Sequence, residues 1–409
     1  MIKDPTTFEY SLEAVFRERD SISRAQHAAF EQYAAIRMPH RRLEDWKWSD
    51  FNAELRDKSP SLAPTAEALV DTFPLSELDP LEFRIVNGRI ILPDEAPRDG
   101  IDFGVMDPVG TIPELEKHPL AILNVAMISK ACGIQIQEGV DYQRPIVIRH
   151  INYGGGLTFA HGLMRISKGA SATVIESFEG EGAALGSYLC HMSVCDNAHI
   201  RRYVISEEET DAVTHSILAA KIDKNARFDQ TSLSTGSRLS RHETVLHYCD
   251  DDVRANIDSV ALLADDRHAD FTTNILHKAP GCITRQRHKG IATDKGRAVF
   301  QGKFAVERQA QKTFAQMSAN ALLLSDESEA NHKPELEIYA DDVECAHGST
   351  SGALDEDALF YLRQRGLSER EARAILTMAF ATEVLDDIEH DEISVMMEGR
   401  VNAWLGASI

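Results

Sequence analysis

A cysteine and a histidine stand two residues apart near the end of the strand-rich part of the chain, at Cys345 and His347. In an extended strand, side chains two residues apart point to the same face. A thiol and an imidazole on one face can share a soft metal such as iron, copper or zinc. Two ligands do not complete a metal site, so the pair predicts half of a site or none.

The surroundings of this pair favour a role at a surface. An acidic run at 341–344 precedes it, and the polar residues 348–350 follow it. Such a segment is typical of the rim of a folded body, where a side chain can meet another molecule. The alternative interpretation is a buried thiol–imidazole pair with a purely structural role.

Other cysteine and histidine groups are weaker candidates. Cys190 and His191 lie close to Cys195, but adjacent residues face opposite sides of a strand, which disfavours a shared metal. His247 and Cys249 share a face, and burial in a packed core is the simpler interpretation for them. The sequence contains no Walker A phosphate loop and no H-E-x-x-H or G-x-S-x-G motif. The pair near the end of the strand region is therefore the leading candidate site.

The composition of the chain limits the classes of function. It has 409 residues, a formal net charge of −22 and six cysteines without a C-x-x-C pair. The negative charge argues against a nucleic-acid groove or an anionic membrane as the main partner. The sparse cysteines indicate reduced thiols, and the sequence shows neither a signal peptide nor an apolar run of ~18 residues. We therefore expect a soluble cytoplasmic protein.

Small turn elements recur at a nearly constant interval through the middle of the chain. One set has members 28, 28, 27 and 29 residues apart, and a second set lies about midway between them. The first set is centred on Gly169, Asn197, Asn225, Asp252 and Gly281, and the second on Asp266 and Gly296. Glycine and asparagine suit the left-handed backbone of a coil corner. The repeat predicts a mainly β fold, a flattened parallel β-helix, with an antiparallel sandwich as the alternative.

Helical patterns flank the repeat, so we expect three domains. An N-terminal helical domain covers residues 1–82, in which Trp46 and Trp48 are expected to anchor a domain junction. The β-helix core covers residues 83–352, and a C-terminal helical domain covers residues 353–409.

The start of the core and the tail carry more detailed signals. A lead-in up to about residue 143 contains an Asn-Gly hairpin at 83–92 and one apolar helix at 119–132. In the tail, a capping box at Ser368 opens a helix that is expected to run to residue 388. Solenoids need capped ends, so the tail is expected either to cap the coil or to bind a partner.

Three segments near the C-terminal end resemble a known family. They are P-E-L-E-I at 334–338, D-D-V-E-C-A-H-G at 341–348 and F-Y-L-R-Q-R-G at 360–366. These segments resemble the hallmarks of the SufB/SufD family of iron–sulfur cluster assembly scaffolds, and the C-x-H-G form is similar to the SufD branch. Further similar segments lie at 44–48, 87–90 and 320–326.

The resemblance implies a fold and a role. The fold would be a right-handed parallel β-helix flanked by N-terminal and C-terminal helical domains. The chain would be a non-enzymatic scaffold subunit of the SUF complex and would pair with a SufB-like paralogue through the β-helix. A nascent iron–sulfur cluster would form transiently at that interface, with His347 as a metal ligand and the other ligands from the partner chain. Cys345 is the weaker candidate, and reduced flavin is a further implied cofactor.

The resemblance also implies a second partner, a SufC-like ABC ATPase docked on the C-terminal helices. This fits the missing Walker A loop. The residues assigned to this contact are Phe360, Tyr361, Arg365 and Phe380. Neither nucleic acid nor a membrane is expected as a partner. Pairing of two copies of this chain is the alternative to a heterodimer.

Two other classes of function compete with the scaffold. A carbohydrate-active β-helix enzyme would use two of the many carboxylates as acid and base, but no acidic and aromatic cluster recurs at one coil position. A purely structural interaction protein would keep Cys345 and His347 buried. Glycan cleavage by the purified protein would favour the enzyme. Accessibility of the Cys345 thiol in the isolated chain and in a complex distinguishes a buried pair from an interfacial one.

Overall fold

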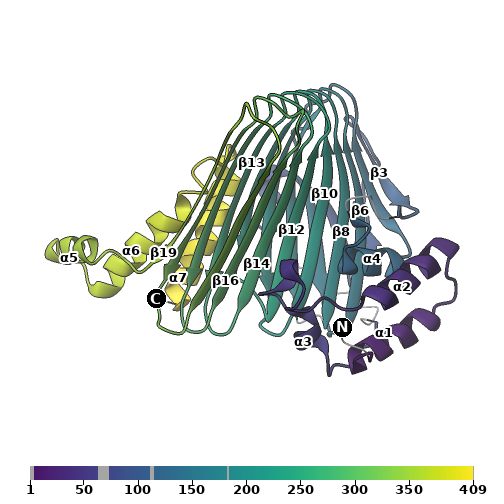
Figure 1. Ribbon diagram of the computed structural model, residues 1–409, viewed down its shortest axis with the longest axis horizontal. Coiled ribbons are helices and arrows are strands. Elements are labelled where there is room, and N and C mark those ends of the chain that lie inside the picture. The colour runs from purple at the N-terminus through teal and green to yellow at the C-terminus, as the bar shows by residue number, and fades with distance from the viewer. Residues whose placement is uncertain (1–3, 63–72, 111–114, 182–183, 409) are drawn as a thin grey trace.

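Strands that follow one another in the chain alternate between two sheets, so the chain winds as a β-solenoid (Figure 1). The computed structural model describes residues 4–62, 73–110, 115–181 and 184–408. Strands pair in parallel with those one turn before and after, except for one antiparallel pair per sheet at the N-terminal end. The parallel pairing confirms the β-helix and excludes the antiparallel sandwich. The right-handed winding of the β-helix stays a prediction.

The two sheets contain ten and nine strands. The ten-stranded sheet has the order β19-β17-β15-β13-β11-β9-β7-β5-β1-β2. Its strands are β1 (Leu81–Val86), β2 (Arg89–Ile91), β5 (Ile146–Asn152), β7 (Ser171–Gly180), β9 (His199–Glu208), β11 (Arg227–Ser234), β13 (Arg254–Leu263), β15 (Ile283–Ala292), β17 (Phe314–Leu323) and β19 (Glu344–Gly352).

The nine-stranded sheet has the order β18-β16-β14-β12-β10-β8-β6-β4-β3. Its strands are β3 (Ile101–Met106), β4 (Ala131–Ile136), β6 (Leu157–Ile166), β8 (Leu185–Val194), β10 (Val213–Ile222), β12 (Leu239–Tyr248), β14 (His268–His277), β16 (Arg297–Val306) and β18 (Glu329–Ile338). The predicted hairpin is confirmed, because β1 pairs with β2 in antiparallel register.

The first set of predicted turn residues occupies coil corners. Gly169, Asn197, Asn225, Asp252 and Gly281 all have a positive φ, between 53° and 74°. This left-handed backbone is accessible to glycine and tolerated by asparagine and aspartate. The interval of 27 to 29 residues is therefore the distance along the chain between successive left-handed corner residues on one edge of the coil.

The second set was misplaced by one or two residues. The left-handed residues there are Asp265 and Asp294, with φ of 55° and 50°, rather than Asp266 and Gly296. Gly296 has another role, because a Cβ on it would lie 3.0 Å from backbone atoms of Leu263 on the preceding turn. It therefore allows two turns of the coil to approach each other.

Apolar side chains fill the interior of the solenoid and also cover much of its outer faces. The interior core extends from Leu81 and Phe83 to Met317 and Ala319. Strands such as β12, in which every residue is buried, pack on both faces. Burial on both faces removes the simple alternation of buried and exposed residues, and in β12 it encloses polar side chains such as Arg241 and Glu243 as well as apolar ones.

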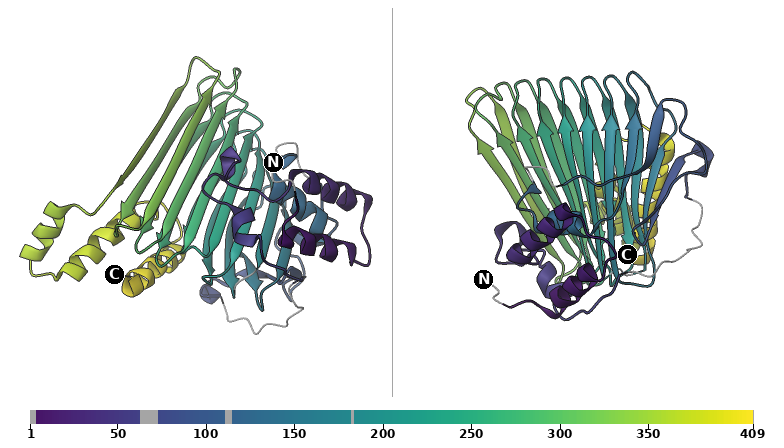
Figure 2. Two further views of the ribbon diagram at one scale, coloured as in Figure 1. Left: turned by 60° about the horizontal axis from the view of Figure 1, so that its bottom comes forward. Right: turned by 90° about the vertical axis from the view of Figure 1, so that its right-hand side faces the viewer.

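The N-terminal helices lie against the nine-stranded sheet (Figure 2). They are α1 (Thr7–Arg17), α2 (Arg24–Ile36), the 3-10 turn η1 (Glu44–Trp46), α3 (Phe51–Leu55) and α4 (Pro119–Met127). A second 3-10 turn, η2 (Ser76–Leu78), lies on the ten-stranded sheet instead, where Leu78 packs on its outward apolar residues. Phe8 and Leu12 of α1 pack with α4 and with the first residues of several strands of this sheet. Trp46 is buried at this junction, as expected for an anchor.

The predicted apolar helix is shorter than its sequence pattern suggested. α4 ends at Met127, and Cys132 lies on β4 instead. Pairing of β4 with both β3 and β6 gives this segment two strand neighbours. Tertiary pairing therefore overrides the local helical pattern.

The C-terminal helices are α5 (Glu356–Gln364), α6 (Glu369–Thr382) and α7 (Asp391–Ser408). Residues of α6, α7 and their connection, including Leu385 and Val401, pack on outward residues of the ten-stranded sheet such as Val260. Figure 1 shows α5 projecting away from the solenoid. The cap interpretation is thus wrong, because the tail covers a side of the coil and leaves its last strands uncovered.

The helix predicted to reach residue 388 ends at Thr382. Residues 383–390 cross the ten-stranded sheet, where Glu383 pairs with Lys289 and Asp387 with Arg287 at 2.6 Å each. We call this segment the strap. Among the helices of the described ranges, none is both long and apolar enough to cross a membrane.

Candidate functional site

Cys345 and His347 lie on β19, the last strand of the ten-stranded sheet. Their register partners on β17 are Ala315 and Met317, which belong to the interior core. The two side chains therefore share the inward face of their strand, as their spacing predicts. Since β19 ends its sheet, this inward face is open at the end of the solenoid.

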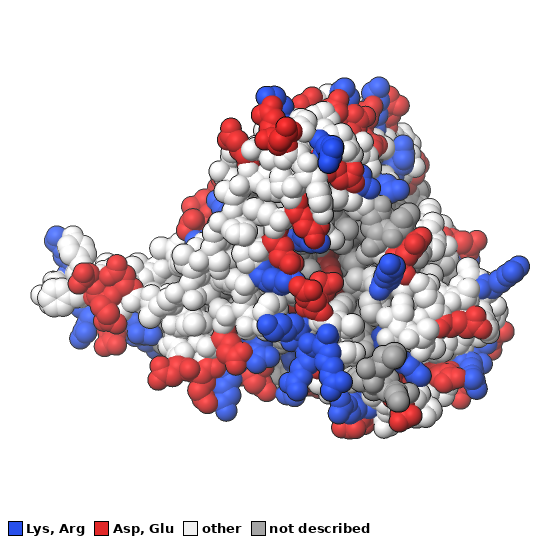
Figure 3. All heavy atoms as spheres, viewed as in Figure 1, with Lys and Arg blue, Asp and Glu red and all other residues white. Residues whose placement is uncertain are grey.

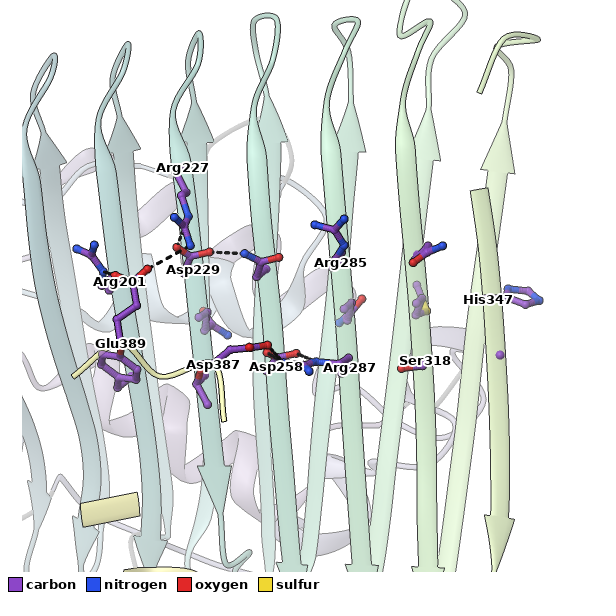
Figure 4. Close-up of a pocket in the computed structure, with 18 of the residues that line it drawn as sticks. Arg201, Arg227, Asp229, Asp258, Arg285, Arg287, Ser318, His347, Asp387 and Glu389 are labelled. Atoms are coloured by element: carbon purple, nitrogen blue, oxygen red, sulfur yellow. Dashed lines mark hydrogen bonds and ion pairs between the residues drawn. The ribbon is translucent and has the colours of Figure 1, made fainter. Parts of the chain in front are cut away.

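The two side chains of the pair differ in accessibility. Cys345 is half-buried against the core, and burial raises the pKa of its thiol. The thiol is therefore protonated near neutral pH, and the thiolate is the form that binds metal. His347 is exposed, and Figure 4 shows its ring pointing away from the neighbouring strands. His347 is thus the accessible ligand of the two.

A second histidine lies at the same open end. His332 on β18 contacts Ser349 on β19, with 2.8 Å between Nδ1 and Oγ. Burial lowers the pKa of His332, so its ring is neutral at pH 7. The contact joins the two last strands and directs Ser349 inward, on the face of His347. Sequence reasoning missed His332 because it lies in the other sheet.

Both last strands have an unpaired edge. β18 pairs with β16 and β19 with β17, and no strand of the described residues follows them. β19 is exposed at nearly every position. Unpaired strand edges readily accept a strand from another chain. We call the open edges of β18 and β19, together with Cys345 and His347, the terminal face.

The four residues assigned to the tail contact fall into two groups. Phe360 and Tyr361 on α5 are 64% and 58% exposed. Arg365 lies 5.1 Å from the ring centroid of Tyr361 and donates a hydrogen bond to its hydroxyl. Phe380 is half-buried in the packing of α6, 4.4 Å from the Lys289 ammonium. The first three therefore form an exposed cluster, which Phe380 does not join.

The described residues contain one further group with metal-ligand atoms, formed by His118, His215 and Glu243. Both histidines contact the same carboxylate oxygen of Glu243, at 3.1 and 2.9 Å. These residues come from distant segments, so no local motif could have indicated the cluster.

The chemistry of this cluster favours an anchor over a metal site. His118 Nδ1 accepts a hydrogen bond from the backbone of α4, so the neutral ring carries its proton on Nε2, where a metal would have to bind. Arg241 donates to the same Glu243 oxygen and pairs with Asp270 at 2.8 Å. Its guanidinium lies 4.1 Å from the Trp46 ring centroid. The cluster thus holds the N-terminal domain on the nine-stranded sheet.

Among the described residues, none of the other cysteines belongs to a group of three or more side chains that could hold a metal ion. Cys190 faces the interior, where burial raises the pKa of its thiol to about 12, while the His191 ring lies beside His161. The sequence predicts that His247 and Cys249 are both buried. This prediction is confirmed for His247 and wrong for Cys249, which is exposed. Cys249 is exposed because β12 ends one residue before it.

Charged side chains of both signs are interspersed over the face covered by the N-terminal helices (Figure 3). The net charge of −22 therefore does not appear there as one continuous acidic surface.

The chain belongs to the family of the SUF system FeS cluster assembly SufBD core domain, whose description matches residues 149–380, more than half of the chain. This stretch covers most of the solenoid, β19 and part of the tail. The protein is therefore a SUF-system component of iron–sulfur cluster assembly with a β-solenoid core.

Comparison with individual proteins agrees with this assignment. The chain is 29% identical to the iron–sulfur cluster assembly protein SufD of Escherichia coli over 389 residues, which cover 92% of this chain and 91% of that relative. It is 25% identical to an iron–sulfur cluster assembly SufBD family protein of Synechocystis, covering 90% and 87%. It is 22% identical to SufD of Bacillus subtilis, covering 67% and 64%.

Proposed function

We propose that this chain is a non-enzymatic scaffold subunit that pairs with a SufB-like paralogue at the terminal face. Iron and sulfide are the cargo, and a nascent cluster forms transiently between the two subunits. The observation that carries this proposal is the position of His347, an exposed ligand on an inward strand face that opens at the end of the solenoid. A second subunit placed there would enclose it.

The chemistry of the pair supports an interfacial site. Iron–sulfur clusters are held mainly by cysteine thiolates, and histidine can replace cysteine at some irons. One exposed imidazole cannot hold a cluster by itself, so the remaining ligands must come from the partner. Such a divided site suits an assembly scaffold, because separation of the subunits would expose the cluster for transfer.

The open edges of β18 and β19 support the pairing geometry. Their free backbone N–H and C=O groups can bond to matching strands of the paralogue, extending both sheets across the interface. The two sheets end together, so one partner solenoid can engage both edges.

Docking of a SufC-like ATPase on the tail is the second part of the proposal. Phe360 and Tyr361 offer exposed aromatic surface on a helix that projects from the body. Aromatic and arginine side chains are typical anchors of protein interfaces. Arg365 beside Tyr361 completes such an anchor, whereas Phe380 serves the packing of the tail on the sheet.

Several finer expectations stay predictions. They are the right hand of the coil, the cytoplasmic location, the use of reduced flavin and the alternative pairing of two copies of this chain. None of them is needed for His347 to act as an interfacial ligand.

The proposal is tested by replacing His347 with alanine in the complex of this chain with its paralogue and ATPase. Cluster yield, followed by visible absorbance and by iron and sulfide content, is expected to fall about tenfold or more because one iron ligand is lost. His27→Ala is the matched control, since His27 is an exposed histidine on α2. Normal yield from an intact complex carrying His347→Ala would overturn the assigned role.

A further inference from the structure

A groove of about 700 Å³ runs over the outer face of the ten-stranded sheet and ends beside the terminal face. It reaches from β9 to β19, where His347 borders it (Figure 4). The strap forms one of its walls through Asp387 and Glu389. We call it the arginine groove, because Arg201, Arg227, Arg285 and Arg287 line it.

Carboxylates neutralise three of the four arginines. The ion pairs join Arg201 to Glu389, Arg227 to Asp229 and Glu389, and Arg287 to Asp258 and Asp387, at N···O distances of 2.5 to 3.5 Å. These pairs hold the strap on the sheet and leave little positive charge for another molecule.

Arg285 differs from the other three. It is exposed and forms no ion pair with a carboxylate within the described ranges, and its guanidinium lies 5.5 Å from the ring centroid of Phe314. Its register neighbours are Asn256 on β13 and Gln316 on β17, which also line the groove. The Asn256 amide already donates one hydrogen bond to Asp229, at 2.7 Å, and retains a second N–H. The Gln316 amide offers two N–H donors beside the guanidinium.

We propose that the arginine groove binds a small organic anion, with its carboxylate or phosphate group on Arg285. A planar guanidinium flanked by amide donors matches the oxygen geometry of both groups. In a chain of net charge −22, anions are repelled in general, so binding depends on this local cation.

The distance from Arg285 to the end of the groove at β19 limits the length of the ligand. β15 and β19 are separated by β17, a distance of about 10 Å at the usual strand spacing. An anion of the size of a tricarboxylate or a mononucleotide can therefore contact Arg285 and extend along the groove as far as β19, whose outward residues Ala346 and Gly348 line it there.

Isothermal titration of the full-length chain with citrate, inorganic phosphate and AMP tests the inference. Arg285→Gln is compared with Arg254→Gln. Arg254 is exposed on β13 and is two residues from Asn256, hence on the same outer face, but it does not line the groove. Both variants remove one positive charge, so a general electrostatic effect would weaken binding equally in both.

The inference predicts that at least one probe binds and that Arg285→Gln weakens binding about tenfold, the loss of one charge-assisted hydrogen bond. Arg254→Gln should change affinity by less than about twofold. Tighter binding of citrate than of AMP and phosphate would identify a carboxylate ligand, and the reverse order a phosphate ligand. Absence of binding by all three probes, or equal losses in both variants, would overturn the inference. Neither result depends on cluster formation, so failure here is separate from failure of the role of His347.

Discussion

At the scale of residues, burial decides which side chains can meet another molecule. His347 is exposed and free to bind a metal, while the half-buried Cys345 keeps its proton because burial raises its pKa. Their common strand face could be predicted, since a spacing of two residues is a local property of a strand. The cluster around Arg241 could not, because Trp46 and Glu243 are brought together only by the fold.

Glu208 gives a pH-dependent prediction. It is 2% exposed, and burial raises its pKa to about 7. Between about pH 4.5 and pH 7, the unfolded chain releases this proton while the folded protein retains it. The unfolded state then binds fewer protons, so the contribution of Glu208 to stability falls as pH rises through this window.

Replacing Glu208 with glutamine removes this effect. The difference in melting temperature between Glu208→Gln and the wild type should shift in favour of the variant from about pH 5 to about pH 8. The corresponding change in the free energy of unfolding is at most about 3 kcal/mol. Thermal denaturation by circular dichroism at both pH values measures the difference. A difference that does not change with pH would show that Glu208 is ionised throughout.

Arg241 gives a prediction about stability. It is 1% exposed and pairs with Glu243 and Asp270 beneath Trp46. Arg241→Met leaves two buried carboxylates without their cation, which costs about 3–5 kcal/mol. The melting temperature should fall clearly, whereas Arg254→Met on the exposed face should leave it nearly unchanged. Equal melting temperatures for the two variants would contradict the anchoring role.

At the scale of elements, local signals predicted what local residues determine. The Asn-Gly hairpin and the corners at Gly169 and Asn225 were correct because left-handed backbone depends on the residue itself. The predicted end of α4 was wrong, because the pairing of β4 depends on distant strands. The position of the tail could not be predicted, because α6 packs on strands far away in the sequence. The family resemblance supplied the proposed role of the tail as a docking site, which no periodicity contains.

The exposed cluster on α5 predicts where the ATPase binds. Phe360→Ala combined with Tyr361→Ala should weaken binding of the SufC-like ATPase at least about tenfold, because two aromatic anchors are removed. The fold should be unchanged, since both side chains are exposed. Binding is measured by surface plasmon resonance, with Tyr10→Ala as the control at an exposed aromatic residue of α1. Unchanged affinity would place the ATPase elsewhere.

The packing of the tail predicts the effect of its removal. Truncation after Gly352 uncovers apolar residues of the ten-stranded sheet, among them Val260 and Leu262. Large exposed apolar patches promote association. The truncated chain is therefore expected to aggregate, as measured by size-exclusion chromatography with light scattering. A monodisperse, folded product would mean that the tail contributes little to the body.

At the scale of the whole molecule, the two ends of the solenoid differ. The N-terminal end finishes in antiparallel strands, β2 and β3, and helices cover both outer faces (Figures 1 and 2). The C-terminal end presents the uncovered edges of β18 and β19. The molecule thus has one end suited to pairing, and His347 lies there.

The most direct test of this account is pulsed electron paramagnetic resonance on the reduced cluster in the assembled complex. Histidine in this chain alone carries an isotopic nitrogen label, while the paralogue and the ATPase are unlabelled. We predict a hyperfine coupling from the labelled nitrogen that disappears in His347→Ala and persists in His27→Ala. A cluster without coupling to labelled nitrogen, or a coupling that survives in His347→Ala, would contradict a site shared between the two subunits through His347.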